Sequence, residues 1–97
     1  MGTEWSGPTL KCVIAWSERR NLCSIMANAI ETKIGPEEVR RLGDDALAVF
    51  GTYEPLEIRE WISGLLAEDE SALVIEFERW SSYGPGLDTA WLMRRGH

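Results

Sequence analysis

Apolar residues along three short stretches of the chain follow the alternating pattern of β-strands. Residues 10–16 and 46–53 are apolar at both alternating sets of positions. A strand that is apolar on both faces is covered on both, so we predict that these two strands are central in a sheet. Residues 73–78 alternate apolar with partly acidic positions, as expected of a strand that the core covers on one face.

Apolar residues at helical spacing lie between these strands. One stripe, within residues 22–34, follows Ser17, whose hydroxyl is suited to cap a helix, and ends at Gly35. A second stripe, within residues 56–66, follows Pro55, a residue favoured in the first helical turn. The sequence therefore predicts two amphipathic helices, each placed between strands.

A last short helix is predicted over residues 87–95. Asp88 lies near its start and two arginines at its end, where the helix dipole favours each sign of charge. Trp91 in this segment would expose a large apolar group if the segment were mobile. We therefore expect the segment to be ordered and Trp91 to be buried.

Residues 37–43 fit two structures. They are long enough for a two-turn helix that ends at Gly43, or they form an outer strand that turns at residues 43–45. The strand gives the order β-α-β-β-α-β, an α+β ferredoxin-like split βαβ fold with a short C-terminal helix. The alternative is a three-stranded α/β domain with an extra short helix at residues 36–43. We favour the ferredoxin-like fold, since its first and third strands are central and are the two that are apolar on both faces.

The length of 97 residues allows one domain. We expect residues 1–9 to form a flexible leader, residues 10–80 the ferredoxin-like domain, and residues 81–97 a C-terminal loop and short helix. No apolar run reaches the roughly 18 residues of a membrane span, and no signal peptide opens the chain, so we expect a cytoplasmic protein with no membrane partner.

The charged and nucleophilic residues give little support for an enzyme. The net charge of −6 makes this an acidic protein and disfavours nucleic acid as a partner, because phosphates must be neutralised by Lys and Arg. The single histidine, His97, gives almost no support to a Ser-His or Cys-His catalytic pair. Cys12 and Cys23 lie in apolar segments, which indicates core residues in a reducing compartment. We therefore predict no catalytic residues, no metal and no cofactor.

The fold has a consequence for interactions, because both long helices cover the same face of the sheet. The other face is predicted to have an apolar centre ringed by Lys11, Glu76 and Glu78, which is typical of a contact surface. The C-terminal segment either covers this face or covers the face of a partner. We therefore expect a non-enzymatic interaction module that self-associates, as a homodimer, through its open sheet face and C-terminal segment. The candidate interface residues are Val13, Ala15, Ala48, Phe50, Val74, Trp80, Tyr83 and Trp91. Trp16 and Trp61, in contrast, are predicted to be core residues.

The second half of the sequence resembles a known family. Residues 48–52 (AVFGT) lead into residues 55–59 (PLEIR), an acidic loop, residues 71–76 (SALVIE), a glycine-containing loop and residues 88–92 (DTAWL). This order is similar to that of the SinR-like relatives of the small CRISPR-associated nuclease-fold subunits. The resemblance covers residues 10–92 in order of elements and is sharpest from Ala46 onward. It implies a ferredoxin-like dimer closed by a C-terminal segment.

The same resemblance gives an alternative function, that of a divalent-metal-dependent ribonuclease or deoxyribonuclease that uses Mg or Mn. The nuclease members have an acidic residue at the end of the first strand, whereas this chain has Trp16 there and Glu18 displaced toward the helix. Glu76 and Glu78 project from one side of the last strand and could share a cation. The alternative catalytic residues are therefore Glu76, Glu78 and Glu18.

Overall fold

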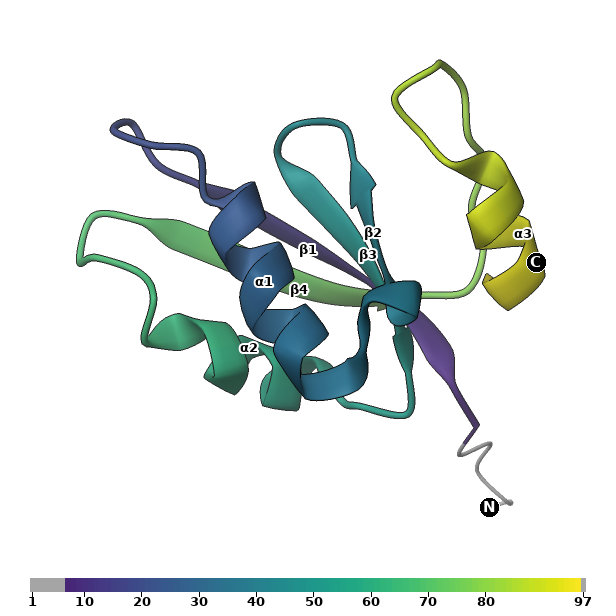
Figure 1. Cartoon of the computed structure of the whole chain (residues 1–97), viewed down its shortest axis with the longest axis horizontal. Coiled ribbons are helices and arrows are strands. Elements are labelled where there is room, and N and C mark those ends of the chain that lie inside the picture. Colours follow the sequence, from purple (N-terminus) through teal and green to yellow (C-terminus); the bar gives the residue numbers. More distant parts are fainter. Residues whose placement is uncertain (1–6, 97) are drawn as a thin grey trace.

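The computed structural model describes residues 7–96, so most of the predicted leader lies outside the described residues. Figure 1 shows the arrangement of the elements. In chain order they are β1 (Thr9–Trp16), α1 (Cys23–Ile34), η1 (Pro36–Glu38), β2 (Val39–Leu42), β3 (Ala46–Gly51), α2 (Pro55–Ser63), β4 (Ser71–Phe77) and α3 (Thr89–Gly96). The predicted ferredoxin-like order with a C-terminal helix is confirmed.

The four strands form one antiparallel sheet in the order β2-β3-β1-β4. β1 and β3 are central, as their apolar residues on both faces predicted. Cys12 in the middle of β1 lies opposite Ala48 of β3 on one side and Ile75 of β4 on the other. The two edges of the sheet are therefore β2, with four residues, and β4, with seven.

The segment for which the sequence allowed two structures contains a short helical turn followed by a strand. Pro36–Glu38 forms one turn of 3-10 helix, and Val39–Leu42 then pairs with β3. Gly43 has a φ of 74°, in the left-handed region that glycine adopts without strain, and the chain reverses there. The strand interpretation is confirmed, and the three-stranded alternative is wrong.

Helix α1 begins later than predicted, at Cys23. The hydroxyl of Ser17, the predicted cap, instead accepts a hydrogen bond at 3.1 Å from the backbone N–H of Arg19 within the loop. At the observed start of α1, Asn21 Oδ1 accepts a hydrogen bond at 3.0 Å from the N–H of Cys23. Residues 17–21 are all polar, so they have no apolar side chain to bury against the sheet.

Helices α1 and α2 lie side by side over one face of the sheet (Figure 1). The main core between them and the sheet includes Leu22 just before α1, Met26 and Ile30 of α1, and Ile58 and Ile62 of α2. Trp61 packs at the margin of this core, where its ring meets that of Tyr53 edge-on at 5.1 Å between centroids. The predicted core role of Trp61 is therefore confirmed.

Three predicted interface residues lie on the face opposite to the one expected. The side chains of Val13, Ala15 and Val74 belong to the core beneath α1 and α2. Lys11, expected at the rim of the open face, shares the covered face of β1 with Val13 and is fully buried. Both alternating sets of β1 are mainly apolar, so no polar set marked the outer face, and the assignment of faces was wrong.

Buried Lys11 is accommodated by oxygen atoms at the end of the sheet. Its Nζ donates hydrogen bonds to Gly51 O at 2.6 Å, Thr9 Oγ1 at 2.8 Å and Thr9 O at 3.1 Å. Loss of hydration lowers the pKa of Lys11, and the negative charges of Glu76, Glu54 and Glu57 partly oppose this shift. These three acceptors satisfy the ammonium, so Lys11 is a structural residue of the covered face.

Candidate functional site

Helix α3 covers part of the open sheet face and is fastened there by Trp91. Trp91 is 0% exposed and, with Leu92, packs on Leu10 and Ala48 in a second, smaller core. The indole Nε1 donates a hydrogen bond to Glu37 O at 2.8 Å. The predictions that Trp91 is buried and that this segment is ordered are confirmed, and the segment covers its own chain's sheet.

Two guanidinium groups lie close to the ring of Trp91. The guanidinium groups of Arg40 and Arg95 lie 5.6 Å and 4.5 Å from the centre of its rings, at cation–π distance. Arg95 also pairs with Glu38 at 2.9 Å, and Asp88 caps α3 by accepting a hydrogen bond from the N–H of Trp91 at 3.1 Å. The C-terminal segment is thus joined to η1 and β2 by several independent contacts.

This second core also contains other residues that the sequence suggested for an interface. Ala48 is fully buried, and Phe50 and Trp80 are half-buried around Trp91 and Leu92. Their contacts are therefore made within the chain. Tyr83, in contrast, is 98% exposed in the loop before α3.

The rest of the open face has an uncovered group of apolar side chains, here named the open apolar patch. Trp16 is 53% exposed, Leu73 49% and Ile75 42%, and the last two lie opposite half-buried Ile14 and Cys12, which belong to the same patch. The prediction of a core position for Trp16 is therefore wrong. The alternation of β1 could have identified the set, because residues 10, 12, 14 and 16 share one face.

Strand β4 brings this apolar surface to the edge of the sheet. On the helix side of β4, a cavity of about 200 Å³ is lined by exposed Leu56 and Arg59 of α2 together with Ala72 and Val74. Leu73 lies at the same edge on the open side. Glu76 is the single charged residue within the strand. Within residues 7–96 no strand pairs with the outer edge of β4, and apolar side chains are exposed on both sides of that edge.

The structure brings together two of the three candidate catalytic carboxylates. Glu76 and Glu78 line one cavity of about 300 Å³ at the end of β4. Glu76 is paired in register with Lys11, whereas Glu18 lies beyond the other end of β1. The distance along β1 from Lys11 to Trp16 alone is roughly 17 Å. Glu18 is therefore remote from the pair within one chain. Among residues 7–96, no group of three or more His, Cys, Asp and Glu is arranged to hold a metal ion.

An ionic cluster that the sequence did not indicate closes the Trp16 end of the sheet. The side chain of Glu70 is fully buried and accepts hydrogen bonds from Arg20 at 2.7 Å, Ala67 N at 2.8 Å and Ser17 Oγ at 2.9 Å. Arg20 first, and then the Ala67 N–H, hold the pKa of Glu70 well below its usual range. The cluster ties the loop after β1 to the turn before β4.

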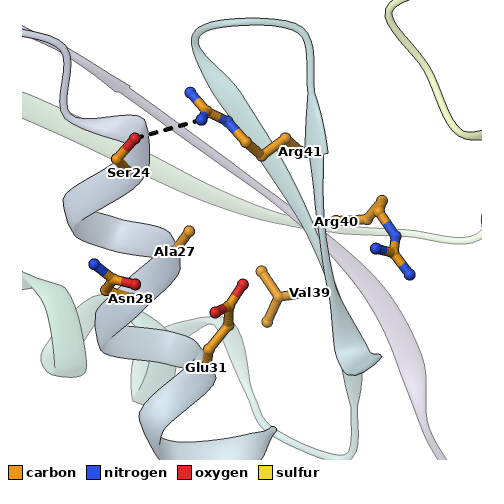
Figure 2. Close-up of a pocket in the computed structure, with 7 residues that line it drawn as sticks. All are labelled: Ser24, Ala27, Asn28, Glu31, Val39, Arg40 and Arg41. Atoms are coloured by element: carbon orange, nitrogen blue, oxygen red, sulfur yellow. Dashed lines mark hydrogen bonds between the residues drawn. The ribbon is translucent and has the colours of Figure 1, made fainter. Parts of the chain in front are cut away.

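A groove runs between α1 and the outer edge of β2 (Figure 2). Its volume is about 580 Å³, and its lining combines polar and apolar side chains. Figure 2 shows that the side chain of Arg41 extends toward Ser24, to which Nη1 donates a hydrogen bond at 3.4 Å, while Arg40 points to the other side of the strand. The lining residues are Ser24, Ala27, Asn28, Glu31, Val39, Arg40 and Arg41.

Comparison with known proteins gives no relative from which a function could be transferred. No protein-family model, curated protein or solved structure matches the chain. Within residues 7–96, no helix has both the length and the apolar character needed to cross a membrane.

Proposed function

We propose that this protein is a non-enzymatic interaction module that forms a homodimer through the β4 edge and the adjoining part of the open apolar patch. The observation that carries the proposal is the exposure of apolar residues on both sides of an unpaired seven-residue edge strand. Monomeric proteins commonly protect such edges with charges, bulges or covering segments. A dimer is also what the resemblance to the SinR-like proteins implies. We place the module in the cytoplasm, where Cys12 and Cys23 would stay reduced.

A second copy of the chain fits this edge by symmetry. If two β4 strands pair antiparallel with Val74 on the two-fold axis, Leu73 of one copy lies opposite Ile75 of the other. The two sheets then join into one, and the unpaired N–H and C=O groups of both edges find partners. Apolar cross-strand pairs of this kind each contribute roughly 0.2–1 kcal/mol.

The same register also brings opposite charges together. Glu76 of one copy comes opposite Ala72 of the other, on the helix side of the sheet. Arg59 lines the same cavity as Ala72, so it would lie beside the Glu76 carboxylate of the second copy. Two-fold symmetry produces this contact twice. Apolar complementarity and charge complementarity therefore select the same occupant, a second copy of the chain.

Sedimentation equilibrium of charge-reversed variants tests the proposal. The unmodified protein is expected to form dimers at roughly tens of micromolar. Glu76→Arg or Arg59→Glu should each weaken the dimer about fivefold or more, and the double variant should restore most of the loss. Glu60→Arg, which makes the same charge change at an exposed position of α2, is the matched control and should have no effect.

Ile75→Lys gives an independent readout, since it places two ammonium groups beside the two-fold axis. Circular dichroism should show an unchanged fold, because Ile75 is exposed in the single chain. Sedimentation should show a monomer. A strictly monomeric unmodified protein, or a dimer unaffected by Ile75→Lys, would contradict the proposal.

A further inference from the structure

We propose that the groove between α1 and β2 binds an extended peptide, which adds to the sheet as a fifth strand beside β2. β2 is the last strand on its side, and within residues 7–96 no other strand pairs with its outer edge. The backbone N–H and C=O groups of such an edge can form a ladder with another chain segment. β2 and β4 are opposite edges of the sheet, so this site does not depend on the proposed dimer.

The shape of the groove suits an extended segment. Its apolar lining comes from Val39 and Ala27, which are both buried, and Ala27 is small enough to leave space above it. Ser24, Asn28 and Glu31 follow one another at the spacing of successive helical turns and line the α1 side. The volume of about 580 Å³ lies within the usual range of ligand sites. A strand of about four residues would match the length of β2.

Charges at the two ends of the groove define the chemistry of the peptide. Arg41 reaches toward Ser24 at one end, and the Glu31 carboxylate lies toward Val39 at the other (Figure 2). Within residues 7–96, neither Arg41 nor Glu31 takes part in an ion pair. Both charges are thus available to a ligand.

The spacing of these charges along β2 gives a sequence preference. Arg41 and Val39 are two residues apart, so their side chains share the α1 side of the strand. Antiparallel pairing is the more stable arrangement. An antiparallel peptide would present an acidic side chain to Arg41 and, two residues later, a basic side chain to Glu31. The ligand is therefore a peptide with an acidic–any–basic pattern in extended conformation.

A synthetic peptide probe tests this directly. Acetyl-Thr-Val-Glu-Val-Lys-Val-Thr-amide carries the expected pattern, and the control peptide has Glu and Lys exchanged. Titration of the nitrogen-15-labelled protein should shift the amide signals of residues 39–42 and of the α1 residues that line the groove. The matched peptide should bind about fivefold or more tightly than the exchanged one. N-methylation of alternate peptide amides should abolish binding for the set that faces β2 and spare the other set.

A charge-reversed variant of the protein tests whether the peptide binds in the groove between α1 and β2. Arg41→Glu, at an exposed position, should abolish the preference, because each peptide then meets one opposite and one like charge in the groove, and the double variant Arg41→Glu/Glu31→Arg should reverse it. Arg94→Glu on α3, which packs on the other face of the sheet, is the control and should leave both affinities unchanged. The peptide titration is also done with Ile75→Lys, so that loss of the dimer and loss of peptide binding are separable.

Three results would overturn the proposal. The first is the absence of saturable shifts at millimolar peptide. The second is equal affinity of the Arg41→Glu variant and the unmodified protein for the matched peptide. The third is concentration-dependent shifts of residues 39–42 without peptide, which would mean that a second copy of the chain occupies the groove.

Discussion

The part of the open sheet face that α3 covers and the part that it leaves uncovered contain similar side chains in different surroundings. Leu10 and Ala48 are buried beneath Trp91, whereas Trp16 and Leu73 on the same face are about half exposed to solvent. The strands are apolar in both parts. The difference comes from an eight-residue helix at the end of the chain, whose length limits the area that it covers. Burial on this face is therefore set by α3 and not by the strands.

The two parts are also held at their margins by different forces. Trp91 fastens the covered part through apolar contacts and the cation–π contacts of Arg40 and Arg95. Buried Glu70, bound by Arg20, closes the other end of the sheet, beside Trp16. Apolar contacts are insensitive to mild acid, whereas the buried Glu70 carboxylate loses its ion pairs on protonation. The carboxylates beside α3, Glu38 and Asp88, are more exposed than Glu70. The two parts should therefore respond differently to mutation and to pH.

The largest effect is expected from Trp91→Ala. Truncation of a buried tryptophan typically costs about 3–5 kcal/mol, a large share of the roughly 5–15 kcal/mol by which a small domain is stable. Urea unfolding should show this loss, and binding of a hydrophobic dye should increase as Leu10 and Ala48 become exposed. Tyr83→Ala, which removes a 98% exposed aromatic from the same segment, should change the free energy of unfolding by less than about 0.5 kcal/mol. Unchanged stability after deletion of residues 87–97 would contradict the anchoring role of α3.

The sequence predicted the helices and strands more reliably than it predicted which face of the sheet each strand residue occupies. The alternation in residues 10–16 gave a central strand, and Trp91 and Asp88 gave a buried, capped C-terminal helix. The assignment of faces failed because Lys11 was read as a surface residue. Lys11 can be buried because its ammonium donates hydrogen bonds to Thr9 and Gly51. Gly51 is 40 residues away, so the residues around Lys11 in the sequence do not indicate this contact.

The open apolar patch was harder to predict, because its extent depends on which part of the sheet face α3 leaves uncovered. Trp16 and Ile75 became surface residues only through the limited reach of α3. Glu70 lies in the acidic loop before residues 71–76, and its partners Ser17 and Arg20 are about 50 residues away in the chain. Charge and hydrophobicity along the sequence cannot reveal such pairings without the fold.

A smaller effect is expected from Glu70→Gln, which tests the ionic end of the sheet. The pKa of Glu70 is lower in the folded chain than its value of about 4.3 in an unfolded one. The unfolded state therefore binds more protons, so the stabilisation from Glu70 is present above about pH 5 and is lost progressively as the pH falls. The unmodified protein should lose thermal stability on acidification, and the variant should start lower at pH 7 and lose less.

Hydrogen exchange measured by mass spectrometry locates this acid effect. Acid should increase exchange in residues 17–23 and 64–70 before it increases exchange in residues 87–95, because only the first two segments depend on Glu70. Glu68→Gln, at an exposed position in the same turn, is the control and should retain the pH dependence of the unmodified protein. Parallel pH curves for Glu70→Gln and the unmodified protein would show that the ionic cluster does not stabilise this end.

The smallest effect concerns Cys12, which lies within the open apolar patch, one strand away from the β4 edge. Burial raises the pKa of Cys12, so its thiol should react more slowly with a disulfide reagent than a free thiol does, but faster than buried Cys23. Pairing of two β4 edges leaves the sheet face open, so the rate for Cys12 should change by less than about twofold between dilute monomer and concentrated dimer. Packing of two open faces against each other would instead cover the thiol and slow its reaction at least about tenfold. High dilution of the unmodified protein gives the monomer rate, because a lysine at position 75, opposite Cys12, would itself change the reactivity of the thiol. Strong protection of Cys12 in the concentrated unmodified protein would move the interface from the edge to the face.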